Sequence, residues 1–343
     1  MRSIMNLENL EKILANQPKF RLKQIYRAIY HDLIKDWSKA SNLPLALRQE
    51  LSAKCDLNIQ GDIFKSKSLG TIKVLITLSD GLKIESVLLQ HNDGRNTVCV
   101  SCQVGCALDC QFCATGQMGF KRNLDCSEIL EQILFFSRYL KTKNQKVTNV
   151  VFMGMGEPFL NYDNVIKAVR ILNDPDCFNI GARKISISTG GIIEGIKKLT
   201  NEDLQVNLAI SLHAPENALR SRLMPINKTN PLKDLILAVN NYIRRTSRKV
   251  MLEYMMIKDV NDSVTQARQL AKLVKDKLYV VNLIPYNITG KFQPSSGSTI
   301  KEFKKVLEKE GINVTQRFSF GHDINASCGQ LATKSLVNNK TAD

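Results

Sequence analysis

Apolar residues along most of the chain follow two alternating patterns. Six runs are almost entirely apolar, and six others carry apolar residues at the spacing of one helix face. Buried strands that alternate with amphipathic helices are typical of a parallel sheet covered by helices. The strand runs are NVVFMGM, KISIST, VNLAISL, KVMLEYMMI, LYVVNLIPY and INVTQRFSF, and the helix runs are SEILEQILFFSRYL, YDNVIKAVRIL, IEGIKKLT, LKDLILAVNNYIRR, SVTQARQLAKLVK and IKEFKKVLEKEG. About six such units predict a partial parallel (β/α)6-type barrel, with its site at the carboxyl ends of the strands.

The beginning of the chain has a different pattern. In FRLKQIYRAIYHDLI the apolar residues recur at helical spacing, and a second helix is expected from Pro44. Residues 1–70 are therefore predicted to form a small helical accessory domain, whose basic residues suit it to bind RNA. Residues 71–98 contain β-rich runs separated by Asp-Gly and Asn-Asp-Gly turns, which predict a short antiparallel meander.

These patterns place the domain boundaries. The barrel is expected over residues 99–330, ending in a catalytic C-terminal loop, and the polar residues 331–343 are expected to form a flexible tail. No apolar run approaches the ~20 residues that a membrane span needs. The first residues do not resemble a signal peptide, so a cytoplasmic protein without membrane contact is expected.

The charge suggests a polyanionic partner. The chain carries 48 basic and 32 acidic residues, a formal net charge of +16. Such an excess favours RNA or DNA as a partner, although a basic surface can also serve solubility alone. Candidate phosphate contacts are Lys121, Arg122, Arg244, Arg245, Arg248 and Lys249, of which the last four also fit a solvated helix end.

Nine cysteines change the picture further, because five of them fall between positions 99 and 113. An odd number in a chain without a secretion signal argues for metal or thiol chemistry. Cys106, Cys110 and Cys113 form a C-x3-C-x2-C pattern, which can bind three irons of a four-iron cube and leave the fourth open for a ligand. The alternative is a zinc site that includes Cys102 or Cys99, but a second CxxC pair is missing.

Polar residues follow several of the predicted strands. The GMGEP motif, residues 154–158, follows one strand and contains Gly156 and Glu157. Other strands are followed by Ser188, Ser211, His213 and Asn287. Glycines allow close approach of the backbone to a ligand, and Glu157 can accept hydrogen bonds from an ammonium group. Singly, each of these residues could be an ordinary cap or loop residue, and His213 a core histidine.

Together these motifs resemble the radical S-adenosylmethionine superfamily. Within it the chain is similar to the bacterial ribosomal-RNA adenine-C2 methyltransferases, which also modify some tRNAs. The resemblance is carried by VSCQVGCALDCQFCATGQMGFKRNL, GMGEP, SLHAP, MPIN, IPYN, ASCGQL and, in the N-terminal domain, FRLKQIY. It spans essentially the whole chain. Cys102 departs from the family, which has serine there.

The resemblance implies the cofactors and the site. It implies a [4Fe-4S] cluster on Cys106, Cys110 and Cys113, and two molecules of S-adenosylmethionine per turnover. Residues implied to contact the cofactor are Gly156, Glu157, Ser188, Ser211, Leu212, His213 and Asn287. Cys328, in ASCGQL, is implied to carry the methyl group, Cys99 to resolve the adduct by forming a disulfide, and Glu85 to take the C2 proton.

The resemblance also implies the substrate and the partners. These are an adenosine of 23S rRNA at the peptidyl-transferase centre, the adenosine 3′ to the anticodon in some tRNAs, and an electron donor such as flavodoxin. A monomer is expected. Two alternatives stay open: methylation at adenine C8, as in related antibiotic-resistance enzymes, and a zinc-stabilised RNA-binding protein without catalysis.

Overall fold

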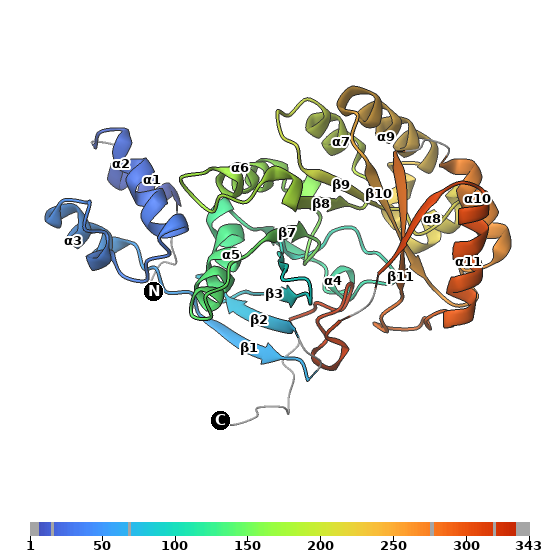
Figure 1. The fold of residues 1–343 in the computed structure, drawn as a ribbon, viewed down its shortest axis with the longest axis horizontal. Coiled ribbons are helices and arrows are strands. Elements are labelled where there is room, and N and C mark those ends of the chain that lie inside the picture. Colours follow the sequence, from blue (N-terminus) through green and yellow to red (C-terminus); the bar gives the residue numbers. More distant parts are fainter. Residues whose placement is uncertain (1–6, 15–16, 68–69, 275–277, 318–319, 334–343) are drawn as a thin grey trace.

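A ten-stranded mixed sheet organises the computed structural model (Figure 1). The structure describes residues 7–14, 17–67, 70–274, 278–317 and 320–333. In the sheet, β1 to β4 pair antiparallel, and the pairs from β4 through β7 to β12 are parallel. The strands are β1 (Gly61–Lys65), β2 (Thr71–Thr77), β3 (Lys83–Gln90), β4 (Asn96–Cys99), β7 (Asn149–Phe152), β8 (Ile185–Thr189), β9 (Asn207–Ser211), β10 (Val250–Met256), β11 (Tyr279–Pro285) and β12 (Asn313–Gln316).

Helices connect the parallel strands, as the periodicity predicted. The six predicted helices correspond to α5 (Cys126–Lys141), α6 (Tyr162–Asn173), α7 (Ile193–Thr200), α9 (Leu232–Thr246), α10 (Val264–Leu273) and α11 (Gly297–Lys309). Capping boxes at Asp125 and Ser263 begin α5 and α10, and such a cap stabilises a helix by about 1 kcal/mol. The pattern did not reveal the short helices α4 (Ala114–Gln117) and α8 (Asn217–Leu223), nor the two-stranded sheet of β5 (Gln103–Gly105) and β6 (Phe120–Asn123).

Strand β4 joins the antiparallel part of the sheet to the parallel part. It pairs antiparallel with β3 and parallel with β7. The predicted meander is therefore confirmed, and its last strand is also the first strand of the barrel. One expectation was wrong: β1 pairs with β2, although its residues lie in the segment predicted to be helical. β1 is a five-residue strand, mostly exposed, so its sequence carries no clear alternation.

The N-terminal helices dock against the C-terminal half of α5. These helices are α1 (Leu7–Leu14), α2 (Phe20–Tyr26) and α3 (Leu45–Lys54). The buried Arg138 donates hydrogen bonds to the carbonyl oxygens of Leu57, at 2.7 Å, and Ile34, and Lys141 donates one to that of Asp32 at 2.8 Å. Figure 1 shows the three helices in blue beside α5, away from the parallel strands.

The C-terminal segment returns from β12 to the antiparallel part of the sheet. In Figure 1 it lies, in red, near β2 and α4. Asp323 accepts hydrogen bonds from the Ser66 hydroxyl at 2.6 Å and the Lys67 amide at 2.7 Å. Leu331 is buried, so the predicted flexible tail does not begin at residue 331; residues 334–343 lie outside the described residues. In the described part of the chain, no helix combines the length and the apolarity needed to cross a membrane.

Candidate functional site

A pocket lies at the carboxyl ends of the parallel strands. Residues at or directly after the ends of all seven parallel strands, β4 and β7 to β12, line it. Ser188 is near the end of β8 and Ser211 is the last residue of β9, while Cys99 ends β4 and Arg317 directly follows β12. This is the position that the barrel pattern predicted for the site.

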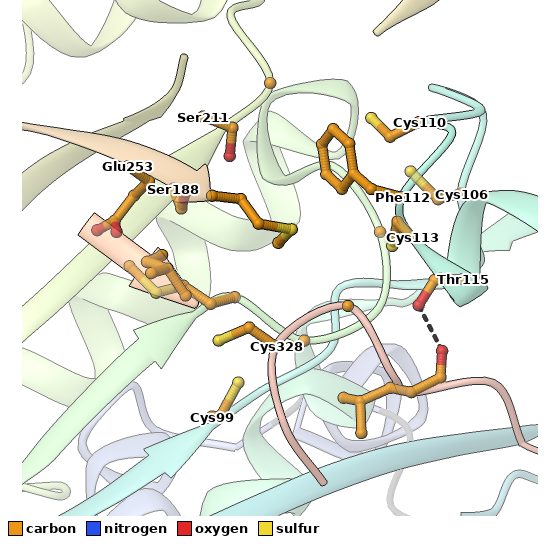
Figure 2. Close-up of a pocket in the computed structure, with 18 of the residues that line it drawn as sticks. Cys99, Cys106, Cys110, Phe112, Cys113, Thr115, Ser188, Ser211, Glu253 and Cys328 are labelled. Atoms are coloured by element: carbon orange, nitrogen blue, oxygen red, sulfur yellow. Dashed lines mark hydrogen bonds between the residues drawn. The ribbon is translucent and has the colours of Figure 1, made fainter. Parts of the chain in front are cut away.

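The three cysteines of the C-x3-C-x2-C motif lie on one side of this pocket (Figure 2). They belong to the loop between β5 and α4, which we call the cluster loop (residues 106–113). The Cys113 amide donates a hydrogen bond to the Cys110 carbonyl oxygen at 3.0 Å, and the Gln111 amide donates one to that of Leu223. The loop is thus folded on itself and fixed to the end of α8, with all three side chains partly exposed to the pocket.

These cysteines fit an iron–sulfur cube. Among the described residues, no three His, Cys, Asp or Glu side chains gather closely enough to hold a single metal ion. A four-iron cube takes one thiolate on each iron, so its ligands do not have to converge on one point. Cys102 is fully buried and does not line the pocket, and its amide donates a hydrogen bond to the Met155 carbonyl oxygen. It is therefore not part of the ligand set that faces the pocket.

The GMGEP segment packs directly against the chain that leads to the cluster loop. A Cβ atom on Gly154 would lie 2.7 Å from the Val100 backbone, and one on Gly156 would lie 2.8 Å from the Gln103 nitrogen. Gly156 also has a φ of +103°, which side-chain-bearing residues rarely adopt. The glycines therefore allow a close approach of backbone to backbone, which brings Glu157 to the pocket wall.

Glu157 presents a buried carboxylate to the pocket. Its two oxygens accept hydrogen bonds from the Gly190 amide at 2.6 Å and the Phe159 amide at 3.0 Å. Burial raises the pKa of this carboxyl to about 6, although these hydrogen bonds oppose the shift. At neutral pH the carboxylate is ionised and can bind a cationic group such as an ammonium.

His213, two residues after the end of β9, is held neutral. It lies in the left-handed backbone region with a φ of 56°, and burial lowers the pKa of its ring to about 3. Its Nδ1 accepts a hydrogen bond from the Met255 amide at 3.1 Å, so the neutral ring carries its proton on Nε2. His213 thus acts as a hydrogen-bond donor at the pocket wall, where its ring contacts Phe112 edge to face.

Two predicted cofactor residues do not line the pocket. The Leu212 side chain is fully buried in the core; its amide donates a hydrogen bond to the Glu253 carbonyl oxygen at 3.0 Å, and its own carbonyl oxygen accepts one from the Ala214 amide at 2.8 Å. Asn287 is buried as well and donates a hydrogen bond from Nδ2 to the Cys328 carbonyl oxygen at 3.0 Å. Its Oδ1 has no hydrogen-bond partner among the described residues. Asn287 therefore holds the segment that carries Cys328.

Cys99 and Cys328 lie near each other on the wall below the polar strand ends (Figure 2). Both are present as thiols rather than as a disulfide. Burial, together with the neighbouring Cys328, raises the pKa of the Cys99 thiol to about 12. The structure thus brings together two cysteines that are more than 200 residues apart in the sequence.

Glu85 is the predicted catalytic residue that the structure does not bring into this pocket. Its carboxylate forms an ion pair with Lys73 at 2.8 Å, and both side chains are only 2% exposed. It lines a separate cavity under the C-terminal segment. The structure therefore places Glu85 beside Lys73 and outside the pocket, and its role as the base stays a prediction.

Sequence analysis missed two arginines of the site, the buried Arg220 and the partly exposed Arg317. Arg220 donates hydrogen bonds to the carbonyl oxygens of Gly190 at 2.7 Å and Ser211 at 3.1 Å, joining the ends of β8 and β9. Arg317 lines the pocket beside the two thiols, and the neighbouring Cys328 is the main cause that raises its pKa. A signal for Arg317 was present, since it is the one basic residue in the apolar run INVTQRFSF.

Most of the basic residues proposed for RNA contact have other positions or partners. Arg122 forms ion pairs with Asp80 and Glu128, each at 2.7 Å. Arg248 donates hydrogen bonds to the Val206 carbonyl oxygen and the Asn207 side chain. The group of residues 244–249 precedes β10, at the amino ends of the strands and thus opposite the pocket. Phosphate contact by these residues stays a prediction, and it would place RNA at the end of the barrel opposite the pocket.

Comparison with known proteins identifies close relatives of the chain. Residues 100–271 match the Radical SAM superfamily. A Dictyoglomus thermophilum protein named as a probable dual-specificity RNA methyltransferase, RlmN, is 46% identical over 95% of this chain and 94% of its own. The ribosomal RNA large subunit methyltransferase N of Nitrosopumilus maritimus is 42% identical over 95% of this chain and 96% of its own.

A solved structure shares the fold over nearly the full length. The crystal structure of a radical SAM methyltransferase from Sphaerobacter thermophilus superimposes with a TM-score of 0.90, at 42% identity, over 95% of this chain and 97% of that one. The N-terminal helices, the mixed sheet and the C-terminal segment therefore all belong to a shared architecture.

Proposed function

We propose the reaction of this chain from one premise: it belongs to the radical S-adenosylmethionine superfamily and, within it, to the RlmN family of RNA methyltransferases. The proposed reaction is methylation at carbon 2 of an adenine in 23S rRNA, at the peptidyl-transferase centre, and of the adenosine 3′ to the anticodon in some tRNAs. The observation that carries the proposal is the pair of thiols, Cys99 and Cys328, that shares one pocket with the cysteines of the cluster loop.

Proteins of this family use a [4Fe-4S] cluster and S-adenosylmethionine. Here Cys106, Cys110 and Cys113 would hold the cluster, which supplies the electron for cleavage of S-adenosylmethionine. Glu157 is placed to bind the ammonium group of that molecule, and Ser188, Ser211 and the Nε2–H group of His213 offer hydrogen bonds to its polar groups. Arg220 fixes the two strand ends that carry these residues.

Cys328 is proposed to carry the methyl group. Its thiolate attacks the methyl carbon of one S-adenosylmethionine, a carbon–sulfur bond forms, and S-adenosylhomocysteine leaves. The Arg317 guanidinium lines the pocket beside Cys328 and would stabilise a negative charge that forms on this sulfur, as a cation beside a cysteine does. The 5′-deoxyadenosyl group released from a second S-adenosylmethionine would take a hydrogen atom from the S-methyl group, and the resulting methylene radical would add to C2 of the adenine. Loss of one electron to the oxidised cluster and of the C2 proton to a base would then restore the aromatic ring, still joined to Cys328.

Cys99 is proposed to release the product. Its sulfur attacks the Cys328 sulfur, the bond between that sulfur and the methylene carbon breaks, and the carbon keeps the electron pair and takes a proton. The product is a methylated adenine and a Cys99–Cys328 disulfide, which an external reductant must reduce. The raised pKa of Cys99 keeps it as a thiol until this step. A flavodoxin-type electron donor and a monomeric cytoplasmic enzyme complete the proposal.

Nucleoside mass spectrometry tests the proposal and its alternatives. The enzyme, reconstituted under anaerobic conditions, is incubated with 23S rRNA fragments and tRNA in the presence of S-adenosylmethionine with a fully deuterated methyl group. We expect 2-methyladenosine whose methyl group retains two deuterium atoms, because one is lost in the hydrogen abstraction. 8-Methyladenosine would instead support the resistance-type alternative. Unmodified RNA with a zinc-containing, iron-free protein would support the non-catalytic one.

A further inference from the structure

A buried ion pair lies beneath the segment that carries Cys328. Lys73 on β2 and Glu85 on β3 are 2.8 Å apart. In the antiparallel register Lys73 is opposite Val87 and Leu75 is opposite Glu85, so the two charged side chains are diagonal neighbours on one face. Removing two charges from water is costly, and removing one partner of such a pair is strongly destabilising because it leaves an unpaired buried charge.

The further contacts are made with the C-terminal segment, on both sides of Cys328. The Lys73 ammonium donates a hydrogen bond to the Asn325 carbonyl oxygen at 3.4 Å. The Ala332 amide donates one to Glu85 Oε2 at 2.9 Å. Asn325 precedes Cys328 and Ala332 follows it, so the ends of this short segment meet on a single ion pair.

These contacts leave the Glu85 carboxylate with both oxygens engaged. Oε1 faces Lys73 and Oε2 accepts the Ala332 amide. The Lys73 ammonium also lies 5.7 Å from the centre of the Phe64 ring, which covers it. The ion pair and the backbone hydrogen bond thus hold the carboxylate in one orientation against the C-terminal segment.

We propose that Lys73 and Glu85 are positioning residues, which clamp residues 325–332 so that the Cys328 sulfur faces the pocket. Helix α4, which follows the cluster loop, also holds this segment. The Ala114 amide donates a hydrogen bond to the Gly329 carbonyl oxygen at 2.8 Å, and the Thr115 hydroxyl donates one to that of Leu331 at 2.6 Å (Figure 2). The catalytic consequence of the clamp rests on the proposed function, whereas the clamp itself does not.

The accessibility of Cys328 tests the clamp directly. In the cluster-loaded enzyme, the rate of Cys328 alkylation by iodoacetamide is followed by peptide mass spectrometry for Glu85→Gln and Lys73→Met. Because either change breaks the ion pair and frees the segment, we expect alkylation to be about tenfold faster in both variants. Arg138→Met is the matched control: it also removes a buried cation, but at the N-terminal domain, and should leave the Cys328 rate unchanged.

A second measurement separates a clamp from a catalytic base. With RNA and S-adenosylmethionine, the clamp predicts that formation of S-methyl-Cys328 slows by a similar factor in both variants. A base predicts that Glu85→Gln forms S-methyl-Cys328 normally and accumulates a covalent protein–RNA adduct, while Lys73→Met does not. That pattern, with an unchanged alkylation rate, would overturn the proposal.

One further variant, Glu85→Asp, and one further measurement, amide hydrogen exchange, keep the test decisive. If Glu85→Gln fails to retain iron, Glu85→Asp keeps the charge but shortens its reach. The clamp then predicts an alkylation rate between those of the wild-type enzyme and Lys73→Met, and faster amide hydrogen exchange over residues 325–332 in Lys73→Met. Wild-type exchange and alkylation in all variants would contradict it. If the wild-type enzyme methylates no RNA, the proposed function fails, but alkylation and exchange still decide the clamp.

Discussion

Two walls of one pocket are built in different ways. The wall of the cluster loop comes from a single stretch of chain, in which three cysteines lie within eight residues of each other in the sequence. The opposite wall combines Cys99 at the end of β4, Arg317 after β12 and Cys328 in the C-terminal segment. Those three residues meet only because the sheet brings its first and last parallel strands to the same pocket.

The difference teaches what each wall depends on. The cluster wall keeps its ligand set wherever the local loop is intact, so it should respond mainly to changes of the ligands themselves. The thiol wall depends on distant contacts, including the hydrogen bond from Asn287 to the Cys328 carbonyl oxygen and the ion pair beneath the segment. It should therefore respond to changes far from the sulfur atoms.

The largest expected effect is the loss of a cluster ligand. Cys106→Ala, Cys110→Ala and Cys113→Ala should each abolish cluster binding and cleavage of S-adenosylmethionine, because a three-ligand cube cannot spare a thiolate. Iron content and 5′-deoxyadenosine formation after anaerobic reconstitution measure this. The matched control is Cys102→Ser, which changes a buried thiol outside the pocket and should retain iron. Loss of iron in the control, with retention in one of the three, would show that the ligand set is wrongly assigned.

The thiol wall should separate into two distinct phenotypes. Cys328→Ala removes the methyl acceptor, so both protein methylation and RNA methylation should stop. Cys99→Ala should still form S-methyl-Cys328 and attack the adenine, and then stall, because no second thiol can displace the RNA. A nuclease-sensitive shifted band on a denaturing gel would reveal this adduct. Normal release of methylated RNA by Cys99→Ala would contradict a resolving role.

The same contrast explains what the sequence could predict. The strand–helix rhythm, the cluster cysteines and the strand-end positions of Glu157 and His213 follow from local patterns, and the structure confirms their placement. Cys328 and Cys99 were identified only through resemblance, since no local pattern marks a thiol as reactive. Glu85 was also identified only through resemblance, and no local pattern predicts its ion pair with Lys73 or the C-terminal segment that covers it.

A smaller effect should follow from the pKa of Glu157. Binding of an ammonium group needs the ionised carboxylate, so affinity for S-adenosylmethionine should fall about tenfold per pH unit below about 6. Because the folded-state pKa is raised, the native protein binds this proton more readily than the unfolded chain. Glu157 should therefore reduce stability as the pH rises from its ordinary pKa to about 6, and no further above that.

Equilibrium binding across pH, compared with Glu157→Gln, measures this effect. The variant should bind S-adenosylmethionine more weakly at neutral pH and lose the pH dependence below 6. Ser188→Ala serves as the comparison, since it lines the same pocket without a titratable group. A wild-type affinity that is flat between pH 5 and 7 would mean that the ammonium group binds elsewhere.

The smallest effect concerns the RNA surface, and it tests which end of the barrel meets the substrate. Lys121 lies in β6, where its neighbour Phe120 pairs with Gly105 next to the cluster loop, and Phe120 is 45% exposed. Arg245 is also exposed, but it lies before β10 at the amino ends of the strands.

If the whole enzyme contacts about five phosphates, log affinity should fall with a slope near −4 against log salt. Because only Lys121 is on the pocket side, Lys121→Gln should reduce the slope by ~0.8, whereas Arg245→Gln should leave it unchanged. Filter binding of a target RNA stem-loop between low and physiological salt measures both slopes. An equal reduction in the two variants would mean that RNA wraps both ends of the barrel, and a larger one for Arg245→Gln would place the binding surface opposite the pocket.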